Sequence, residues 1–195
     1  MKVILVNGSP RERGCTYTAL TECAKALNEN GVETEIMWVG KDSFGGVYDY
    51  GKLVDEFAEK AGEADGFVFG SPVYYAAATG IISMFLDKAF GAAGGKMRGK
   101  VGASVVSCRR GGASAAFDEL NKYFTINSMP IVSSQYWNQV HGNTPEEVMQ
   151  DEEGMQTMRT LGKNMAWLIK CIELGKQNGI EIPPQEAKIM TNYIR

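Results

Sequence analysis

The sequence predicts an α/β protein in which a doubly wound, parallel sheet carries helices on both faces. Short apolar stretches of strand length alternate along the chain with segments whose apolar residues recur at helical spacing. Several of these stretches are almost continuously apolar, as expected for parallel strands that are buried on both sides. With 195 residues, the chain is long enough for one large core, and we expect residues 1–195 to form a single domain.

Five segments are predicted to be strands, because each is short, apolar and bounded by turn-forming residues. In chain order they cover residues 2–6, 32–39, 66–70, 100–107 and 130–133. The second, from Val32 to Val39, alternates in polarity at first, which is typical of a half-exposed strand at a sheet edge. The third, from Gly66 to Gly70, is fully apolar and is typical of a buried strand.

The segments between these strands have the i, i+3, i+4, i+7 spacing of amphipathic helices. We expect Thr16 to cap the first helix, which ends near Asn30 and Gly31, where glycine favours termination. The later helices are predicted near residues 53–61, 79–90, 114–125 and 151–177. Thr144 and Pro145 have the pattern of an N-cap followed by a first helical proline, which indicates a further short helix.

The loop after the first strand has the composition of an anion-binding site. It runs from Ser9 to Thr16 and brings glycine, hydroxyl groups and the charges of Arg11 and Arg13 to a helix N-terminus. It matches neither the G-x-x-x-x-G-K-[ST] nor the G-x-G-x-x-G pattern, which disfavours nucleoside triphosphates and dinucleotides. A terminal phosphate, such as that of flavin mononucleotide, fits better. Taken alone, the loop is also compatible with an ordinary strand-to-helix turn.

Composition and charge limit the class of partner. The formal net charge is −3 and no dense basic run occurs, so we expect no nucleic-acid binding. No apolar run reaches the roughly 18 residues of a membrane span, and we expect no membrane partner. The first residues resemble a strand and not a secretory signal, so we expect a cytoplasmic protein. Its partners are expected to be small molecules.

The four cysteines are widely scattered and the chain has one histidine, so we expect no metal site. Cys23 and Cys171 fall on apolar helix positions, which indicates core packing. Cys15 lies at a helix N-terminus beside two arginines, a setting that would lower the pKa of its thiol and make it reactive. The alternative is that only its backbone N–H group has a role.

Three loops leave the carboxyl ends of the predicted strands, where ligands bind in doubly wound sheets. They are residues 9–16, residues 71–75 with 79–80, and residues 107–113. Together with Met84–Lys88, these loops resemble the NAD(P)H-dependent FMN reductase family of the flavodoxin-like superfamily over most of residues 1–130. The resemblance implies a five-stranded sheet of order 2-1-3-4-5.

The resemblance also implies noncovalently bound FMN, with NAD(P)H as cosubstrate, and assigns its contacts. The phosphate would be held by Ser9, Arg11, Arg13, Gly14, Cys15 and Thr16. The flavin ring would be bordered by Pro72, Val73, Tyr74 and Tyr75. Its pyrimidine end would lie beside Ser107, Cys108, Arg109, Arg110, Gly111 and Gly112. These residues also have interpretations that involve no flavin: the two tyrosines could simply be partly buried loop residues, and Arg109 and Arg110 could be solvated charges on the surface.

The chain departs from the wider family in two places. Iron–sulfur flavoproteins that resemble it place a cysteine cluster after the second strand, whereas residues 40–51 contain no cysteine, so we expect no cluster there. Cys15 stands where many relatives have Asn, which removes a side-chain contact to phosphate but keeps the N–H group. We expect residues 134–154 to form a lid. Within it, Trp137 or His141 would line the nicotinamide or substrate pocket; the alternative is that these residues only pack against the protein or lie on its surface. Residues 179–195 are expected to form a short C-terminal tail.

The implied function is an oxidoreductase that passes a hydride from NADH or NADPH to the flavin and on to a small acceptor, such as a flavin, a quinone or a nitro compound. Hydride transfer needs no acid or base, so no catalytic residue is assigned. An electron carrier of the flavodoxin kind is the alternative, and a phosphate-binding module without redox chemistry is a third. The resemblance also implies a homodimer or a higher homo-oligomer. Arg109, Arg110 and Lys41 are candidates for distinguishing NADPH from NADH.

Overall fold

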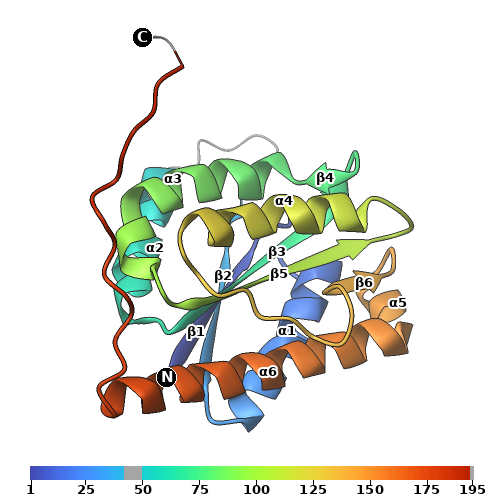
Figure 1. Ribbon diagram of the computed structural model, residues 1–195. Coiled ribbons are helices and arrows are strands. Elements are labelled where there is room, and N and C mark those ends of the chain that lie inside the picture. Colours follow the sequence, from blue (N-terminus) through green and yellow to red (C-terminus); the bar gives the residue numbers. More distant parts are fainter. Residues whose placement is uncertain (42–49, 194–195) are drawn as a thin grey trace.

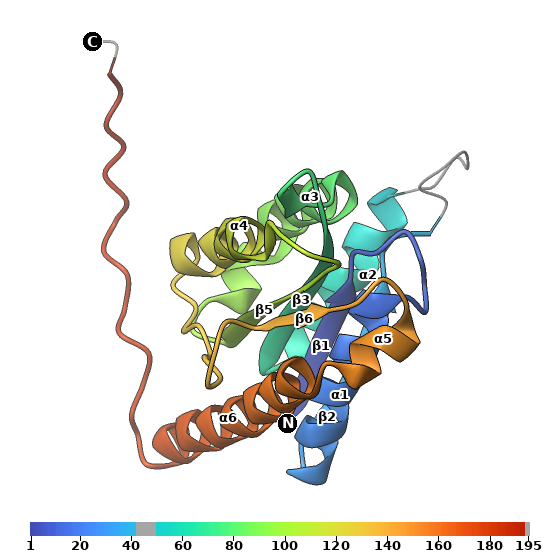
Figure 2. The ribbon, with the colours of Figure 1, turned by 90° about the vertical axis from the view of Figure 1, so that its right-hand side faces the viewer.

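A parallel sheet forms the centre of the molecule, and helices cover both of its faces (Figures 1 and 2). The structure is a computed structural model that describes residues 1–41 and 50–193. Its strands are β1 (Lys2–Asn7), β2 (Glu33–Trp38), β3 (Gly66–Tyr74), β4 (Ala77–Ala78), β5 (Val101–Cys108) and β6 (Gln139–His141). Its helices are α1 (Cys15–Glu29), α2 (Tyr50–Glu63), α3 (Gly80–Met97), α4 (Ala113–Ile126), α5 (Pro145–Gln150) and α6 (Glu152–Gln177).

The α/β class is confirmed, but the sheet is larger than the expected five strands. Its order is β2-β1-β3-β5-β6, all parallel, and the short strand β4 pairs antiparallel with β3. The sixth strand arises because β3 continues to Tyr74 and then turns back on itself. The sequence pattern placed the end of this strand at Gly70, where the apolar run stops. Among the described residues, no helix has the length and apolar character needed to cross a membrane.

The predicted strand at residues 130–133 is wrong. Ile131 forms only an isolated bridge with Gly102, and the strand that pairs with the end of β5 is β6. Pro130 has no N–H group to donate to a ladder, which weakens pairing at this point. The chain bends at Gln135 and Tyr136, beside a hydrogen bond of 2.7 Å from Ser134 Oγ to Asn138 Oδ1, and it returns to the sheet only afterwards.

Alternate residues of β1 enter the two cores of the protein, as the period of a buried strand requires. Ile4 and Val6 pack with α2, α3 and α4, where Phe69 and Phe124 stack with their ring centroids 4.8 Å apart. Val3 and Leu5 pack on the opposite face with α1 and α6. This burial fixes the register of the sheet, and with it the positions of the loops at its carboxyl edge.

Two helix boundaries differ from the prediction. Helix α1 begins at Cys15 with Gly14 as its N-cap, so the predicted capping role of Thr16 is wrong. Helix α3 continues beyond Phe90 to Met97, because Ala93 and Met97 extend its buried face. The predicted cap at Thr144 is confirmed: its hydroxyl accepts a hydrogen bond from the Glu147 N–H group.

Cys23 is buried as predicted, and burial raises the pKa of its thiol to about 12. Cys171 is exposed on the outer side of α6, so its predicted core position is wrong. Residues 178–193 contain neither helix nor strand. Their first part contacts the body of the protein, where the Pro183 carbonyl accepts from Arg98, and their end leads away from it (Figure 2). Most of the cysteine-free loop at residues 40–51 lies outside the described residues, because residues 42–49 are not among them. Residues 194–195, at the end of the predicted tail, also lie outside the described residues.

Candidate functional site

The ends of β1, β3, β5 and β6 meet at one edge of the sheet, where the three predicted loops surround a cleft of about 170 Å³. The cleft is lined by Ser9, Arg11, Cys15, Thr16, Pro72, Val73, Tyr74, Ser107, Cys108, Arg109, Gly142 and Asn143. Except for the last two, these residues belong to the predicted site. Parallel pairing brings them together, because it places the carboxyl ends of neighbouring strands side by side.

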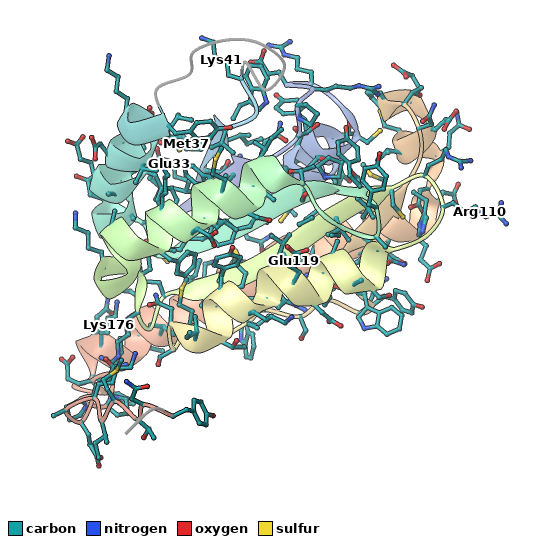
Figure 3. The ribbon with its side chains drawn as sticks, turned by 90° about the horizontal axis from the view of Figure 1, so that it is seen from above. Glu33, Met37, Lys41, Arg110, Glu119 and Lys176 are labelled. Carbon is teal, nitrogen blue, oxygen red and sulfur yellow. The ribbon has the colours of Figure 1, made fainter. Side chains whose placement is uncertain are left out.

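Six predicted site residues do not line this cleft in the described part of the chain, namely Arg13, Gly14, Tyr75, Arg110, Gly111 and Gly112. Arg13 is exposed, and Gly14 caps α1 through its backbone alone. Arg110 points away from the body of the protein (Figure 3). Tyr75 is fully exposed at a hairpin tip, which the spacing of the sequence did not indicate.

Asn7 organises the first loop, although sequence reasoning assigned it no role. It is fully buried at the end of β1, and its Nδ2 donates to the Glu12 carbonyl oxygen at 2.8 Å. Its Oδ1 accepts from the Ser9 N–H group at 3.1 Å. The Ser9 carbonyl in turn accepts from Trp38 Nε1 at 2.8 Å. A polar residue ending an apolar strand is the signal that could have identified this role, because buried polar groups require partners.

Helix α1 approaches the sheet closely, and this approach places Thr16 in the cleft. A Cβ atom on Gly70 would lie 2.9 Å from Thr16 Cγ2 and 2.8 Å from Leu20 Cδ1, so β3 needs glycine at this position. The Thr16 hydroxyl lies 2.8 Å from that of Ser107 on β5. The first and third loops of the predicted site are therefore joined by a buried hydrogen bond.

Helix α1, whose first residues Cys15 and Thr16 line the cleft, is capped differently from α3, α5 and α6. Helices α1 and α4 begin after Gly14 and Gly112, and no described side chain accepts a hydrogen bond from their first turns. Helices α3, α5 and α6 are instead capped by Thr79, Thr144 and Asp151. The first N–H groups of a helix lack partners within the helix and carry partial positive charge. The N-terminus of α1 is thus available to an anion in the cleft, whereas the first residues of α4 do not line it and lie against Ala76 of the hairpin.

The expected lowering of the Cys15 pKa is wrong. Burial raises the pKa of this thiol, and this effect outweighs the opposing influence of its own backbone N–H group and of Arg11. Its Sγ donates toward the Gly142 carbonyl oxygen at 3.7 Å. The thiol therefore contacts the loop after β6, and its raised pKa does not indicate an activated nucleophile.

Gly142 and Asn143, which sequence reasoning did not assign, complete the cleft from the loop after β6. Gly142 N–H donates to the Cys108 carbonyl at 3.1 Å, and the Asn143 N–H group donates to Glu147 Oε2 at 2.7 Å. These bonds hold the loop beside the end of β5. Both residues fall within the predicted lid at 134–154. Trp137 and His141 are not among the described residues that line the cleft.

A hairpin carries Val73 and Tyr74 along one side of the cleft. Tyr75 and Ala76 connect β3 to β4 with φ angles of 53° and 60°. Positive φ at both central residues defines a type I′ turn, for which Asn-Gly is the usual sequence. A non-glycine pair in this conformation is strained and indicates a position that the surrounding structure must hold.

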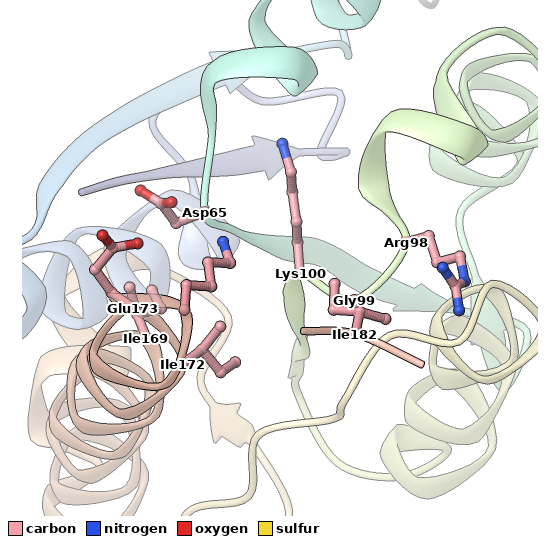
Figure 4. A pocket seen from close by; sticks show the side chains of 9 residues that line it. Asp65, Arg98, Gly99, Lys100, Ile169, Ile172, Glu173 and Ile182 are labelled. Atoms are coloured by element: carbon pink, nitrogen blue, oxygen red, sulfur yellow. The ribbon is translucent and has the colours of Figure 1, made fainter. Parts of the chain in front are cut away.

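A second cavity of about 130 Å³ lies near the opposite edge of the sheet, between α6 and the C-terminal segment (Figure 4). Lys100 lines it, but its Nζ donates to the carbonyls of Ala61 and Gly62 at 2.7 and 2.9 Å. The aliphatic side chains of Ile169, Ile172 and Ile182 form much of the remaining wall. This cavity is at the amino ends of the strands, away from the edge where doubly wound sheets bind ligands.

The cysteines do not form a cluster site. Iron–sulfur clusters are generally held by four cysteine thiolates. Cys23 is buried in the α1 core, Cys171 is exposed on α6, and only Cys15 and Cys108 reach the cleft. Among the described residues, no group of three or more His, Cys, Asp or Glu side chains is arranged to hold a metal ion.

Comparison with known proteins gives a family match over most of the chain. Residues 1–144 match the model of the family described as NADPH-dependent FMN reductase. An iron–sulfur flavoprotein of Methanocaldococcus jannaschii is 32% identical over 192 residues, which covers 89% of this chain and 100% of that protein. An iron–sulfur flavoprotein of Archaeoglobus fulgidus is 26% identical over 196 residues, covering 88% of this chain and 98% of the relative.

Solved structures share the fold. A flavone reductase superposes with a TM-score of 0.71 and 18% identity, covering 89% of this chain and 64% of that one. A flavodoxin from the domain Archaea superposes with a TM-score of 0.64 and 18% identity, covering 87% of this chain and 99% of the flavodoxin. The fold of this chain is therefore flavodoxin-like.

Proposed function

Because this chain belongs to the NADPH-dependent FMN reductase family, we propose that it is an oxidoreductase that uses noncovalently bound FMN to carry electrons from NADH or NADPH to a small acceptor. The observation that supports this most directly is the N-terminus of α1, which no described side chain caps, at a cleft lined by hydroxyl groups and arginines. When bound, FMN supplies the two-electron chemistry that takes a hydride from a nicotinamide and delivers it to an acceptor.

The first loop suits the phosphate of the cofactor. Thr16 and Ser9 carry hydroxyls that line the cleft, and Arg11 adds a guanidinium at its rim. The N–H groups in the first turn of α1 complete the donor set. Charge-assisted bonds to phosphate are stronger than neutral ones, so this loop would supply much of the affinity.

The remaining walls suit a flat ring. At about 170 Å³, the cleft is smaller than the roughly 300–1,000 Å³ usual for a ligand pocket, so it would hold the phosphate end and leave the ring at its rim. Pro72, Val73 and Tyr74 form an apolar wall there, and Tyr74 is 45% exposed.

The names of the relatives suggest an iron–sulfur cluster as well, but the residues of this chain do not fit one. Its cysteines are at positions 15, 23, 108 and 171, and the full sequence has none between residues 24 and 107. We therefore propose that this chain carries out its redox chemistry through the flavin alone. A homodimer or higher homo-oligomer remains a prediction.

The proposal is tested by adding FMN to the purified protein and then adding NADH or NADPH without oxygen. We expect bound flavin, measured by ultrafiltration, and loss of the absorption of the oxidised flavin at one equivalent of reduced nucleotide. Flavin that binds but stays oxidised would favour the electron carrier. A protein that binds no FMN would overturn the proposal.

A further inference from the structure

The hairpin formed by β3 and β4 is too short to be stable by itself. Only Val73 with Ala78 and Tyr74 with Ala77 pair across it. A hairpin this short is marginal by itself, and its turn residues Tyr75 and Ala76 occupy the left-handed region without being glycine. Contacts from elsewhere in the molecule must therefore keep it in place beside the cleft.

Glu119, on α4, supplies such a contact at the base of the hairpin. Its Oε2 accepts a hydrogen bond from the Ala78 N–H group at 2.9 Å, and its Oε1 accepts from Ser83 Oγ at 3.3 Å. Figure 3 shows Glu119 beside the neighbouring helix α3, on which Ser83 lies. An ionised acceptor makes a stronger bond to an N–H group than a neutral one does.

Helix α4 also contacts the tip of the same hairpin. Gly112, its N-cap, has φ 89°, and a Cβ atom at this position would lie 2.7 Å from Ala76 Cα. The turn therefore lies directly against the start of α4, whereas Glu119 binds the hairpin base nearly two helical turns further on. One rigid helix thus holds both ends of the hairpin.

We propose that Glu119 is a positioning residue that holds the β3–β4 hairpin beside the cleft and thereby sets how Val73 and Tyr74 meet the flavin ring. The effect on the flavin ring rests on the proposed function, whereas the anchoring of the hairpin by Glu119 is a property of the protein without flavin. Glu119 does not line the cleft, so its effect on bound flavin passes through the Ala78 N–H group and the hairpin.

A neighbouring residue provides the matched control. Tyr123, one turn further along α4, donates from its hydroxyl to Asp87 Oδ1 at 2.6 Å and thereby joins α4 to α3 without touching the hairpin. Tyr123→Phe removes a hydrogen bond between the same two helices. An effect of Glu119 that arose only from α3–α4 packing would appear in this variant as well.

The test compares Glu119→Leu, Glu119→Gln and Tyr123→Phe in two measurements. The first is amide hydrogen exchange of residues 73–78 in the protein without flavin, and the second is the Kd and midpoint potential of bound FMN. We expect Glu119→Leu to speed hairpin exchange by about tenfold or more, the factor for one lost bond to a charged group, and to weaken FMN binding by a smaller factor because Glu119 acts through the hairpin. Its midpoint potential should shift as well. Glu119→Gln retains an acceptor oxygen and should restore both measurements toward wild type.

Wild-type exchange and midpoint potential in Glu119→Leu would overturn the inference, as would equal changes in Tyr123→Phe. If Glu119→Leu does not fold, Glu119→Asp takes its place in the test, because the shorter side chain keeps the negative charge but cannot reach the Ala78 N–H group. Unchanged hairpin exchange in Glu119→Asp would also overturn the inference. If the wild-type protein binds no FMN, the proposed function fails, and the exchange measurement still decides whether Glu119 anchors the hairpin.

Discussion

The hydroxyl oxygens of Thr16 and Ser107 lie 2.8 Å apart, although 91 positions separate the two residues in the chain. Thr16 is 1% exposed and Ser107 3% exposed, so their bond is shielded from water. It joins the first turn of α1 to the end of β5. The two loops proposed to hold the phosphate and the pyrimidine end of the flavin are thereby kept at a fixed separation.

Thr16→Val should weaken the candidate site, because valine preserves the shape of threonine but removes this bond. A buried hydroxyl left without a partner destabilises a protein by about 1–3 kcal/mol. We expect this loss in chemical denaturation, together with a rise of about tenfold in the Kd of FMN. Thr18→Val is the control, because the Thr18 hydroxyl donates to the Gly14 carbonyl at 3.3 Å and does not line the cleft. Equal effects on FMN binding from both variants would contradict the prediction.

Arg11 and Arg13 should differ in their effect on flavin binding. Both are exposed in the same loop, but only Arg11 lines the cleft. A bond to a charged group contributes about 1.5–3 kcal/mol, so Arg11→Gln should raise the Kd of FMN by roughly 10- to 100-fold. Arg13→Gln should change it by less than about threefold, since distant surface charges are screened. Titration at low and high salt measures both, and a larger loss for Arg13→Gln would show that the phosphate lies elsewhere.

Gly112→Ala should destabilise the protein, whereas Gly111→Ala should not. At Gly112, φ is 89° and a Cβ would lie 2.7 Å from Ala76 Cα. Left-handed backbone at a residue other than glycine costs about 1–2 kcal/mol, and the clash with the hairpin adds to this. A Cβ on Gly111 would meet nothing within 4 Å. Thermal unfolding of the two variants measures the difference, and equal melting temperatures would contradict the close contact between α4 and the hairpin.

The raised pKa of Cys15 predicts slow alkylation at neutral pH. Thiolate is the reactive form, so a raised pKa lowers the reactive fraction at pH 7, and the fraction increases as the pH rises toward the pKa. Iodoacetamide at pH 7 should therefore modify exposed Cys171 before Cys15, as peptide mass spectrometry can determine. Labelling of Cys15 should accelerate with pH and should decrease when FMN is bound. Faster labelling of Cys15 than of Cys171 at pH 7 would instead indicate an activated thiol.

Local chemistry made much of the candidate site predictable. Hydroxyl, glycine and arginine residues directly after apolar strands identified the loops around Ser9 and Ser107, and parallel pairing places such loops together. Asn7 was missed because its role depends on hydrogen bonds to Ser9 and Glu12 that only the folded loop brings into range. Cys15 was misjudged because proximity to arginines is visible in the sequence, whereas desolvation of the thiol is not.

The sequence by itself determined the α/β class, four of the parallel strands and the loops that meet at their ends, because hydrophobic period and turn residues act over short distances. The tertiary structure decided that β6 replaces residues 130–133 beside β5, that Gly142 and Asn143 close the cleft, and that β3 turns back as a hairpin. Each of these depends on contacts between residues far apart in the chain. Which partner such a segment meets depends on packing and on the pairing of buried polar groups, and these arise only when the whole chain has folded.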